Sequence, residues 1–203
     1  MDNRKEKILS VARDLFGQYG LKSVTMDEIA FATGMSKKTI YQIFQDKKSL
    51  VKEVIDFEMN RIKQEIMAIY QQQDLNALER TIEIHKLIIR MYKSYPPQLE
   101  RDLQRHYPDI IKEIHKNMMK EMFEAIVKNL KHGIREGYFR NDLKPEIIAG
   151  LQMVRAQFLR LRLNFSFIPD IPNEQIHKEL LLYHLHGICS KKGLEYLRTI
   201  NLN

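Results

Sequence analysis

Lysine, threonine, tyrosine and glutamine side chains follow one another in a short segment early in the chain. Immediately after Gly34 the sequence reads MSKKTIYQIF. Lysine and glutamine can hydrogen-bond to the edges of bases, and lysine and tyrosine can also bind phosphate oxygens. These residue types therefore indicate recognition of a nucleic acid, provided that the fold projects them from one exposed face.

Two short helices joined by a turn would supply such a face. Thr25 is followed three positions later by Glu28, a capping-box pattern that predicts a helix beginning near Met26. Gly34 suits a helix end with a positive φ angle, and Ser36 suits the cap of the next helix. The spacing thus predicts a helix, a tight turn and a second helix.

The second helix is predicted to have one buried side. Ile40 and Phe44 are four positions apart and share a face, which leaves the polar residues largely on the other faces. Ala30 allows two helices to cross closely, and Asp46 can cap a third helix that begins at Lys47. This motif presents side chains to the major groove of DNA. The alternative is an ordinary helical hairpin whose basic face is only solvated.

Composition narrows the class of protein around this motif. The chain has 203 residues and is 44% hydrophobic, which is enough for a substantial core. The net charge of +7 favours a polyanionic partner. Cys189 is the single cysteine, so no intrachain disulfide can form. No stretch approaches the ~18 apolar residues that span a bilayer, and no signal peptide is seen. We expect a cytoplasmic protein without a membrane partner.

Helical patterns dominate the chain and strand patterns are nearly absent. We expect an all-α fold: an N-terminal three-helix head with the helix-turn-helix motif at residues 1–50, and a helical body for dimerisation and ligand binding at residues 51–203. Pro96 and Pro97 are expected to stop one helix, residues 165–173 to form a loop, and Gly193 to break another helix. The expected helices cover residues 4–18, 47–71, 77–95, 108–136, 144–164 and 174–191.

The head resembles the DNA-binding head of the TetR family of bacterial transcriptional regulators. Two body segments, residues 133–140 and 183–193, also resemble parts of that family. The chain departs from the family pattern at Lys38, where many relatives carry Gly or Ala, and at Ile43, where an aromatic residue or His is common, so no operator sequence is carried over. The matching head residues are Ala12, Leu15, Phe16, Gly20, Thr25, Ile29, Ala30, Gly34, Ser36, Thr39, Ile40, Tyr41, Phe44, Lys47 and Leu50.

This resemblance implies a homodimeric repressor that binds double-stranded DNA at a palindromic operator and is released by a small-molecule effector. Lys37 and Lys38 would bind guanine or phosphate, while Tyr41 would clamp phosphate. Alternatively, Tyr41 is partly core and Lys38 makes no contact. The predicted DNA-binding residues are Thr25, Ser36, Lys37, Lys38, Thr39, Tyr41, Gln42 and Lys47.

The helices near 144–164 and 174–191 are apolar on more than one side, which predicts burial on both sides. Ile147, Leu151 and Val154 line one side of the first of them, and Tyr183 lies on the second. Two such helices from each subunit would pack as a four-helix bundle between subunits. The alternative is a buried pair of core helices within one subunit.

The effector pocket is predicted from adaptable methionines and from aromatic and polar side chains on the body helices. Plain core packing is the alternative for each of them. The candidates are His85, Met91, Tyr92, Met118, Met119, Met122, Phe123, Gln152 and Phe158.

Other chemistry finds little support in the sequence. No phosphate-binding glycine loop, GxSxG or HExxH motif is present, so we expect no enzyme and no cofactor. His177 and His184 share a helix face but lack the company of a metal site, and Cys189 has no resolving partner for redox sensing. The remaining alternatives are a ligand-independent regulator or activator, and a helical enzyme or interaction module.

Overall fold

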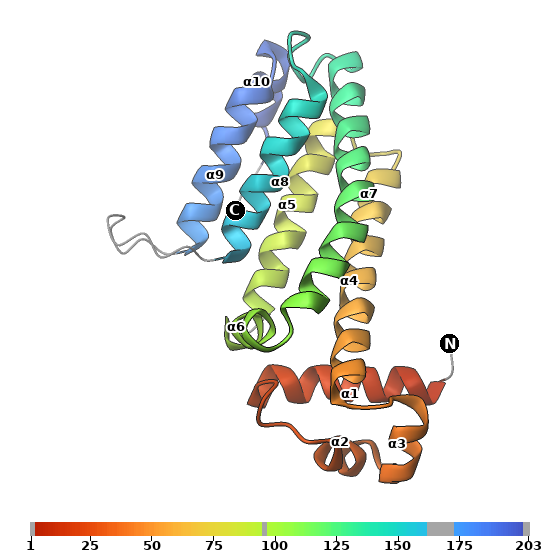
Figure 1. Cartoon of the computed structure of the whole chain (residues 1–203). Coiled ribbons are helices and arrows are strands. Elements are labelled where there is room, and N and C mark those ends of the chain that lie inside the picture. The colour runs from red at the N-terminus through yellow and green to blue at the C-terminus, as the bar shows by residue number, and fades with distance from the viewer. Residues whose placement is uncertain (1–2, 95–96, 162–172, 201–203) are drawn as a thin grey trace. The chain divides into compact units, whose positions relative to one another are not determined.

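The computed structural model describes residues 3–94, 97–161 and 173–200. Over these residues the chain is α-helical, and an isolated bridge between Phe139 and Cys189 is its only β-type pairing (Figure 1). The predicted all-α fold class is confirmed. The helices are α1 (Asn3–Tyr19), α2 (Met26–Thr33), α3 (Lys37–Ile43), α4 (Lys47–Gln71), α5 (Ala77–Ser94), α6 (Pro97–His106), α7 (Pro108–Arg135), α8 (Pro145–Leu161), α9 (Asn173–Ile188) and α10 (Lys191–Leu197).

The chain divides into two compact units. Residues 1–64 and 93–118 form the first, which we call the head unit, and residues 65–92 and 119–203 form the second, the body unit. Helix α4 supplies residues to both. The boundary predicted at residue 50 lies inside α4, and as a functional boundary it stays a prediction.

The head unit is held by one apolar core. Leu99 and Leu103, four positions apart on α6, are buried in the same core as the first helices. Burying one such side chain contributes about 1.5–3 kcal/mol. The largest contributions from α1 to α4 come from Ile8, Leu9, Phe16, Ile29, Ile40, Phe44 and Leu50.

Two buried carboxylates connect elements within the head unit. Asp102 of α6 accepts a hydrogen bond from the backbone N–H of Leu21 at 3.0 Å, just after α1 ends. Glu58 of α4 pairs with Arg13 of α1 at 3.1 Å and with Arg61 at 2.9 Å. Each buried carboxylate is therefore hydrogen-bonded, as burial of a charge requires.

The body unit has its own core, closed at one end by two glycines. A Cβ atom at Gly133 would collide with the ring of Phe139, and one at Gly193 would collide with the carbonyl oxygen of Tyr138. These close approaches let the segment after α7 lie against the end of α9. The core residues include Leu78, Ile82, Leu130, Phe139, Ala149, Leu181, Leu185 and Ile188.

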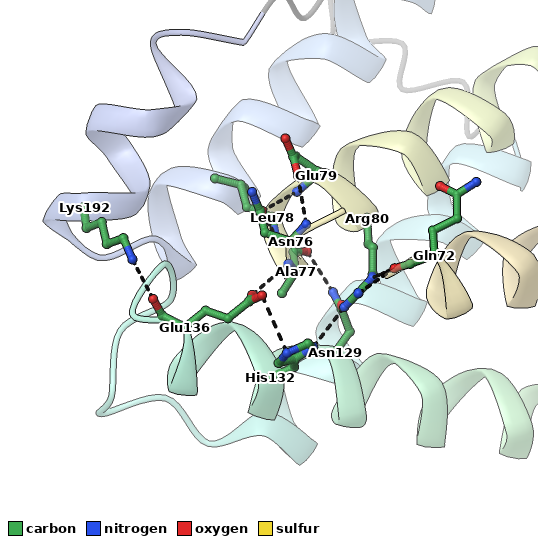
Figure 2. Close-up of polar contacts among 10 residues, drawn as sticks. All are labelled: Gln72, Asn76, Ala77, Leu78, Glu79, Arg80, Asn129, His132, Glu136 and Lys192. Atoms are coloured by element: carbon green, nitrogen blue, oxygen red, sulfur yellow. Dashed lines mark hydrogen bonds and ion pairs between the residues drawn. The ribbon is translucent and has the colours of Figure 1, made fainter. Parts of the chain in front are cut away.

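A polar network fixes the start of α5 within the body unit (Figure 2). The side-chain oxygen of Asn76 accepts two backbone N–H groups of the first turn, both at 3.0 Å. The N–H of Ala77 donates to Glu136 at 2.9 Å, and the Arg80 guanidinium donates to the carbonyl of Gln72 at 2.6 Å. The cap of α5 is thereby joined to the ends of α7 and α4.

Most predicted helices match the structure to within a few residues, but one helix was not predicted and one expectation was wrong. Residues 97–106 form α6, a helix with no counterpart among the predicted elements. Gly193 does not break a helix: α9 ends at Ile188, and Gly193 lies within α10, where its missing side chain permits the approach to Tyr138. The predicted loop at 165–173 falls almost wholly outside the described residues.

Candidate nucleic-acid interface

Helix α2 begins with the capping box that the sequence predicts. The Thr25 hydroxyl accepts from the backbone N–H of Glu28 at 3.2 Å, and the Glu28 carboxylate accepts from the N–H of Thr25 at 2.6 Å. The hydrogen bond from the Thr25 N–H, and a second one from its hydroxyl at 2.9 Å, lower the pKa of Glu28. They also occupy the Thr25 hydroxyl, so the cap mainly fixes the geometry of α2.

The turn and the second cap orient α3. Gly34 has φ +68°, the left-handed conformation that glycine adopts without steric cost. The Ser36 hydroxyl accepts from the N–H of Thr39 at 3.1 Å, and the two hydroxyl oxygens lie 2.8 Å apart. The hydroxyls of Ser36 and Thr39 are thus engaged with each other at the start of α3.

Helix α3 has a buried side and an exposed side. Ile40 is fully buried, whereas Lys37, Lys38 and Gln42 are exposed. Tyr41 is 44% exposed, so its ring is not core. These four exposed side chains, which we call the α3 row, occupy the face that the sequence assigned to DNA contacts.

The two lysines of the α3 row differ in their partners. Lys37 forms an ion pair with Asp27 of α2 at 2.7 Å, and the hydrogen bond to this carboxylate raises the lysine's pKa. Across the described residues Lys38 has no such pair. Lys38 can therefore meet a phosphate or a base without first giving up a carboxylate.

Lys47 is held more tightly than the sequence predicts. It is partly buried, and its ammonium group donates to the carbonyl of Lys22 at 3.3 Å. Burial lowers its pKa, while Glu28 and Asp102 act in the opposite direction. Phe31 of α2 is an exposed aromatic residue that the predicted site residues do not include, although its position next to Ala30, on the inner side of the helix, already indicated an outward face.

The body unit exposes a second surface of another kind. Ile147, Leu151 and Val154 lie on one face of α8 and are 63%, 59% and 64% exposed, and Tyr183 of α9 is 83% exposed. We call these four residues the apolar stripe. The opposite faces of both helices are buried through Ala149, Leu181, Leu185 and Ile188.

Among the described side chains, the predicted pocket residues do not gather at one place. Phe123 lines a groove of about 700 Å³ along α7 and α8, together with Val127, Ile134 and Arg135. His85 is buried and lies against the backbone of His177 on α9, whereas Met119 is exposed. Met91, Met122 and Gln152 are half-buried, and the side chains of Tyr92, Met118 and Phe158 lie outside the description. The pocket stays a prediction.

No metal or redox site emerges from the described part of the chain. Its histidine, cysteine and acidic side chains form no group of three that could hold a metal ion. Cys189 is buried, and burial raises the pKa of its thiol to about 11, which disfavours the reactive thiolate. Within the same described residues, no helix is both long and apolar enough to cross a membrane.

Comparisons with known proteins agree with this geometry. Residues 8–54 match a family model described as bacterial regulatory proteins, tetR family. The HTH-type transcriptional regulator AcrR of Shigella flexneri is 26% identical over 197 residues, or 91% of this chain and 90% of AcrR. The HTH-type transcriptional repressor KstR2 of Rhodococcus jostii (strain RHA1) is 23% identical over 152 residues, or 71% of this chain and 72% of KstR2.

The fold is shared with solved structures. A transcriptional regulator from Cytophaga hutchinsonii matches with a TM-score of 0.76 and 24% identity, over 93% of this chain and all of that one. The matched family segment coincides with the capped α2, the Gly34 turn and the exposed α3 row. The head segment of the chain, residues 8–54, thus belongs to the TetR type of DNA-binding head, and over most of its length the chain is similar to DNA-binding transcriptional regulators.

Proposed function

We propose that this regulator is a homodimeric repressor that binds a palindromic operator through α3 of each subunit and is released by a small-molecule effector. The observation that carries the proposal is the α3 row, which a capped helix with buried Ile40 on its inner side presents to solvent. One relative, KstR2, is named as a repressor, which supports the direction of regulation.

Within the α3 row, helical spacing separates two tasks. Lys38 and Gln42 are four positions apart and project from the same face, where they would bind guanine and adenine edges in the major groove. Tyr41, which precedes Gln42, would bind phosphate. Lys47, at the start of α4, would bind phosphate as well. Base contacts specify the sequence, whereas phosphate contacts fix the register.

The dimer is proposed to form through the apolar stripe. Large apolar side chains gathered on one exposed helix face indicate an interaction site. Leu151 and Val154 on α8 would pack against the same residues of a second copy, with Tyr183 of α9 completing a four-helix bundle. Such an interface is self-complementary, as a two-fold axis demands.

Release by an effector requires that the body unit influence the head unit. Helices α4 and α7 each supply residues to both units. In addition, α6 is packed into the head core, and its Asp102 carboxylate accepts a hydrogen bond from the backbone N–H of Leu21. An effector that favours one arrangement of these helices would shift the population away from the DNA-binding state.

The proposed DNA contacts are tested by selecting duplexes bound by the full chain from a random pool. We expect an enriched palindrome with half-sites one helical turn apart, about 34 Å, or a multiple of that spacing. The double variant Lys38→Ala/Gln42→Ala should lose the enrichment. Lys144→Ala, which removes an exposed lysine of the body unit, should retain it. Enrichment of no sequence by the unaltered protein would overturn the proposal.

A further inference from the structure

Polar side chains from three helices meet inside the body unit. Arg155 of α8 donates through Nη1 to the carbonyl of Leu180 on α9 at 3.3 Å. His85 of α5 lies with Nε2 3.2 Å from the carbonyl oxygen of His177, also on α9. Arg155 and His85 both act on the charge of His184, one turn further along α9 than Leu180. We call Arg155, His85 and His184 the arginine-histidine cluster.

Two nitrogen atoms of this cluster are buried without a hydrogen-bond partner. They are Nε of Arg155 and Nε2 of His184. A buried donor or acceptor left unpaired costs about 1–3 kcal/mol, and more when the group is charged. Natural proteins leave few such atoms, and each one calls for an explanation.

Within the part of the chain that the structure describes, the charge of the cluster is positive and uncompensated. Among the described residues no carboxylate pairs with Arg155, and burial alone lowers its pKa to about 10, which still leaves it protonated at neutral pH. Burial is also the main reason why the pKa of His85 falls to about 4 and that of His184 to about 3. Both imidazoles are therefore neutral at pH 7, and the cluster carries one positive charge.

We propose that the arginine-histidine cluster binds the carboxylate of an organic monoanion. This inference names the chemical class of the effector and so rests on the proposed function. The guanidinium supplies the charge and an unused N–H donor, and His184 supplies a neutral nitrogen that can donate or accept. A monocarboxylate matches the single positive charge, whereas a phosphate dianion would bury an excess negative charge. Ile82 and Leu181, each three positions before one of the histidines on the same helix, are buried apolar residues and favour an apolar remainder of the ligand.

The test is a thermal-shift titration of the full chain without DNA, followed by calorimetric measurement of affinity. The probes are octanoate, benzoate and the shape-matched octanamide, benzamide and octylamine, with inorganic phosphate as a further arm. A ligand that binds only the folded state raises its melting temperature. We expect at least one carboxylate to raise it, and its matched amide, the amine and phosphate to have little effect.

Variants locate the binding. Arg155→Met removes the charge but keeps much of the volume and should weaken carboxylate binding roughly 10- to 100-fold, the loss of one charged hydrogen-bonded contact. Arg155→Lys keeps the positive charge but lacks the planar guanidinium with its several N–H donors. It serves as a second variant in case Arg155→Met does not fold. Arg135→Met is the control, because this exposed arginine lines the groove on α7 and α8.

Two results would overturn the inference: no carboxylate is preferred over its amide, or Arg135→Met abolishes the response while Arg155→Met leaves it intact. A gel shift on the selected operator decides the proposed function separately. If carboxylate binds at Arg155 but the DNA stays bound, the anion site stands and release by this effector fails. If the operator is bound but no carboxylate is, the regulator stands and the anion site fails.

Discussion

At the scale of single residues, the predicted DNA-binding side chains differ in whether they already have a hydrogen-bond or ion-pair partner within the protein. Thr25, Ser36 and Lys47 are committed to hydrogen bonds within the protein, and Lys37 is paired with Asp27. Lys38 is the least committed cation of the α3 row. We therefore expect Lys38 to contribute most to sequence discrimination, although the family pattern places a small residue there.

The first prediction separates base contacts from phosphate contacts. Lys38→Ala should weaken binding to the selected operator by about 1–3 kcal/mol per half-site and relax its sequence preference. Tyr41→Ala should weaken binding to all duplexes and reduce the slope of log K against log salt by about 1 per lost phosphate contact. Anisotropy titrations at several salt concentrations measure both, with Lys144→Ala as control. An unchanged slope for Tyr41→Ala would remove Tyr41 from the interface.

The second prediction concerns pH. The pKa values of His85 and His184 in the folded protein, about 4 and about 3, lie below the ordinary value of 6.5. Between pH 6.5 and 4 the unfolded chain therefore binds protons that the folded chain does not. The free energy of unfolding should fall with falling pH in this range, by about 1.4 kcal/mol per pH unit for each such histidine.

Urea unfolding at pH 7, 5.5 and 4.5 checks this pH dependence. His184→Gln should make the fall shallower, whereas His186→Gln, which alters an exposed histidine of the same helix, should leave it unchanged. Equal pH dependence in all three proteins would contradict the assignment of buried, neutral imidazoles.

Octanoate should also stabilise the wild-type protein at pH 7 if the anion site is correct.

At the scale of elements, the sequence predicted what local chemistry determines. Helices α2 and α3 were predicted correctly because their signals are local. The caps at Thr25 and Ser36 and the turn at Gly34 each depend only on residues a few positions apart. Helix α6 was missed because it follows two prolines and has only Leu99 and Leu103 as a buried pair. Gly193 was misjudged because its role depends on Tyr138, which is distant in sequence.

The third prediction compares two glycines with different roles. Gly34 has φ +68° and open space around its Cα, so Gly34→Ala should cost about 1 kcal/mol through backbone strain alone. Gly193→Ala drives a methyl group against the carbonyl of Tyr138, and overpacking of this kind costs about 1–3 kcal/mol or more. Denaturant midpoints rank the two. A larger loss for Gly34→Ala than for Gly193→Ala would show that the clash is relieved easily.

At the scale of the whole molecule, the sequence indicated which helices are apolar all round but not what each face meets. The structure separates the two faces of α8 into a buried side with Ala149 and an exposed side with Leu151. The burial of Arg155 could not be read from its own helix, because it depends on the residues that α9 and α5 bring against it. The predicted pocket therefore included His85 beside the methionines but neither Arg155 nor His184, whose side-chain nitrogens are unpaired.

The last prediction concerns assembly. Leu151→Glu places a charge in the middle of the apolar stripe, where two copies would have to bury it without a partner. We expect light scattering to report a monomer for this variant and a dimer for the wild-type protein. Asn141→Glu introduces the same charge at an exposed position outside the stripe and should remain dimeric.

Loss of the dimer should carry through to DNA. Binding of two linked heads makes the second half-site contact intramolecular, which raises the apparent affinity by roughly 10²–10⁴ without any new contact. Leu151→Glu should lose that gain on the full palindrome, while its helical content by circular dichroism stays at the wild-type level. It should also bind an isolated half-site as well as the wild-type head does, because α3 is unaltered. A Leu151→Glu protein that stays dimeric would place the subunit interface away from α8.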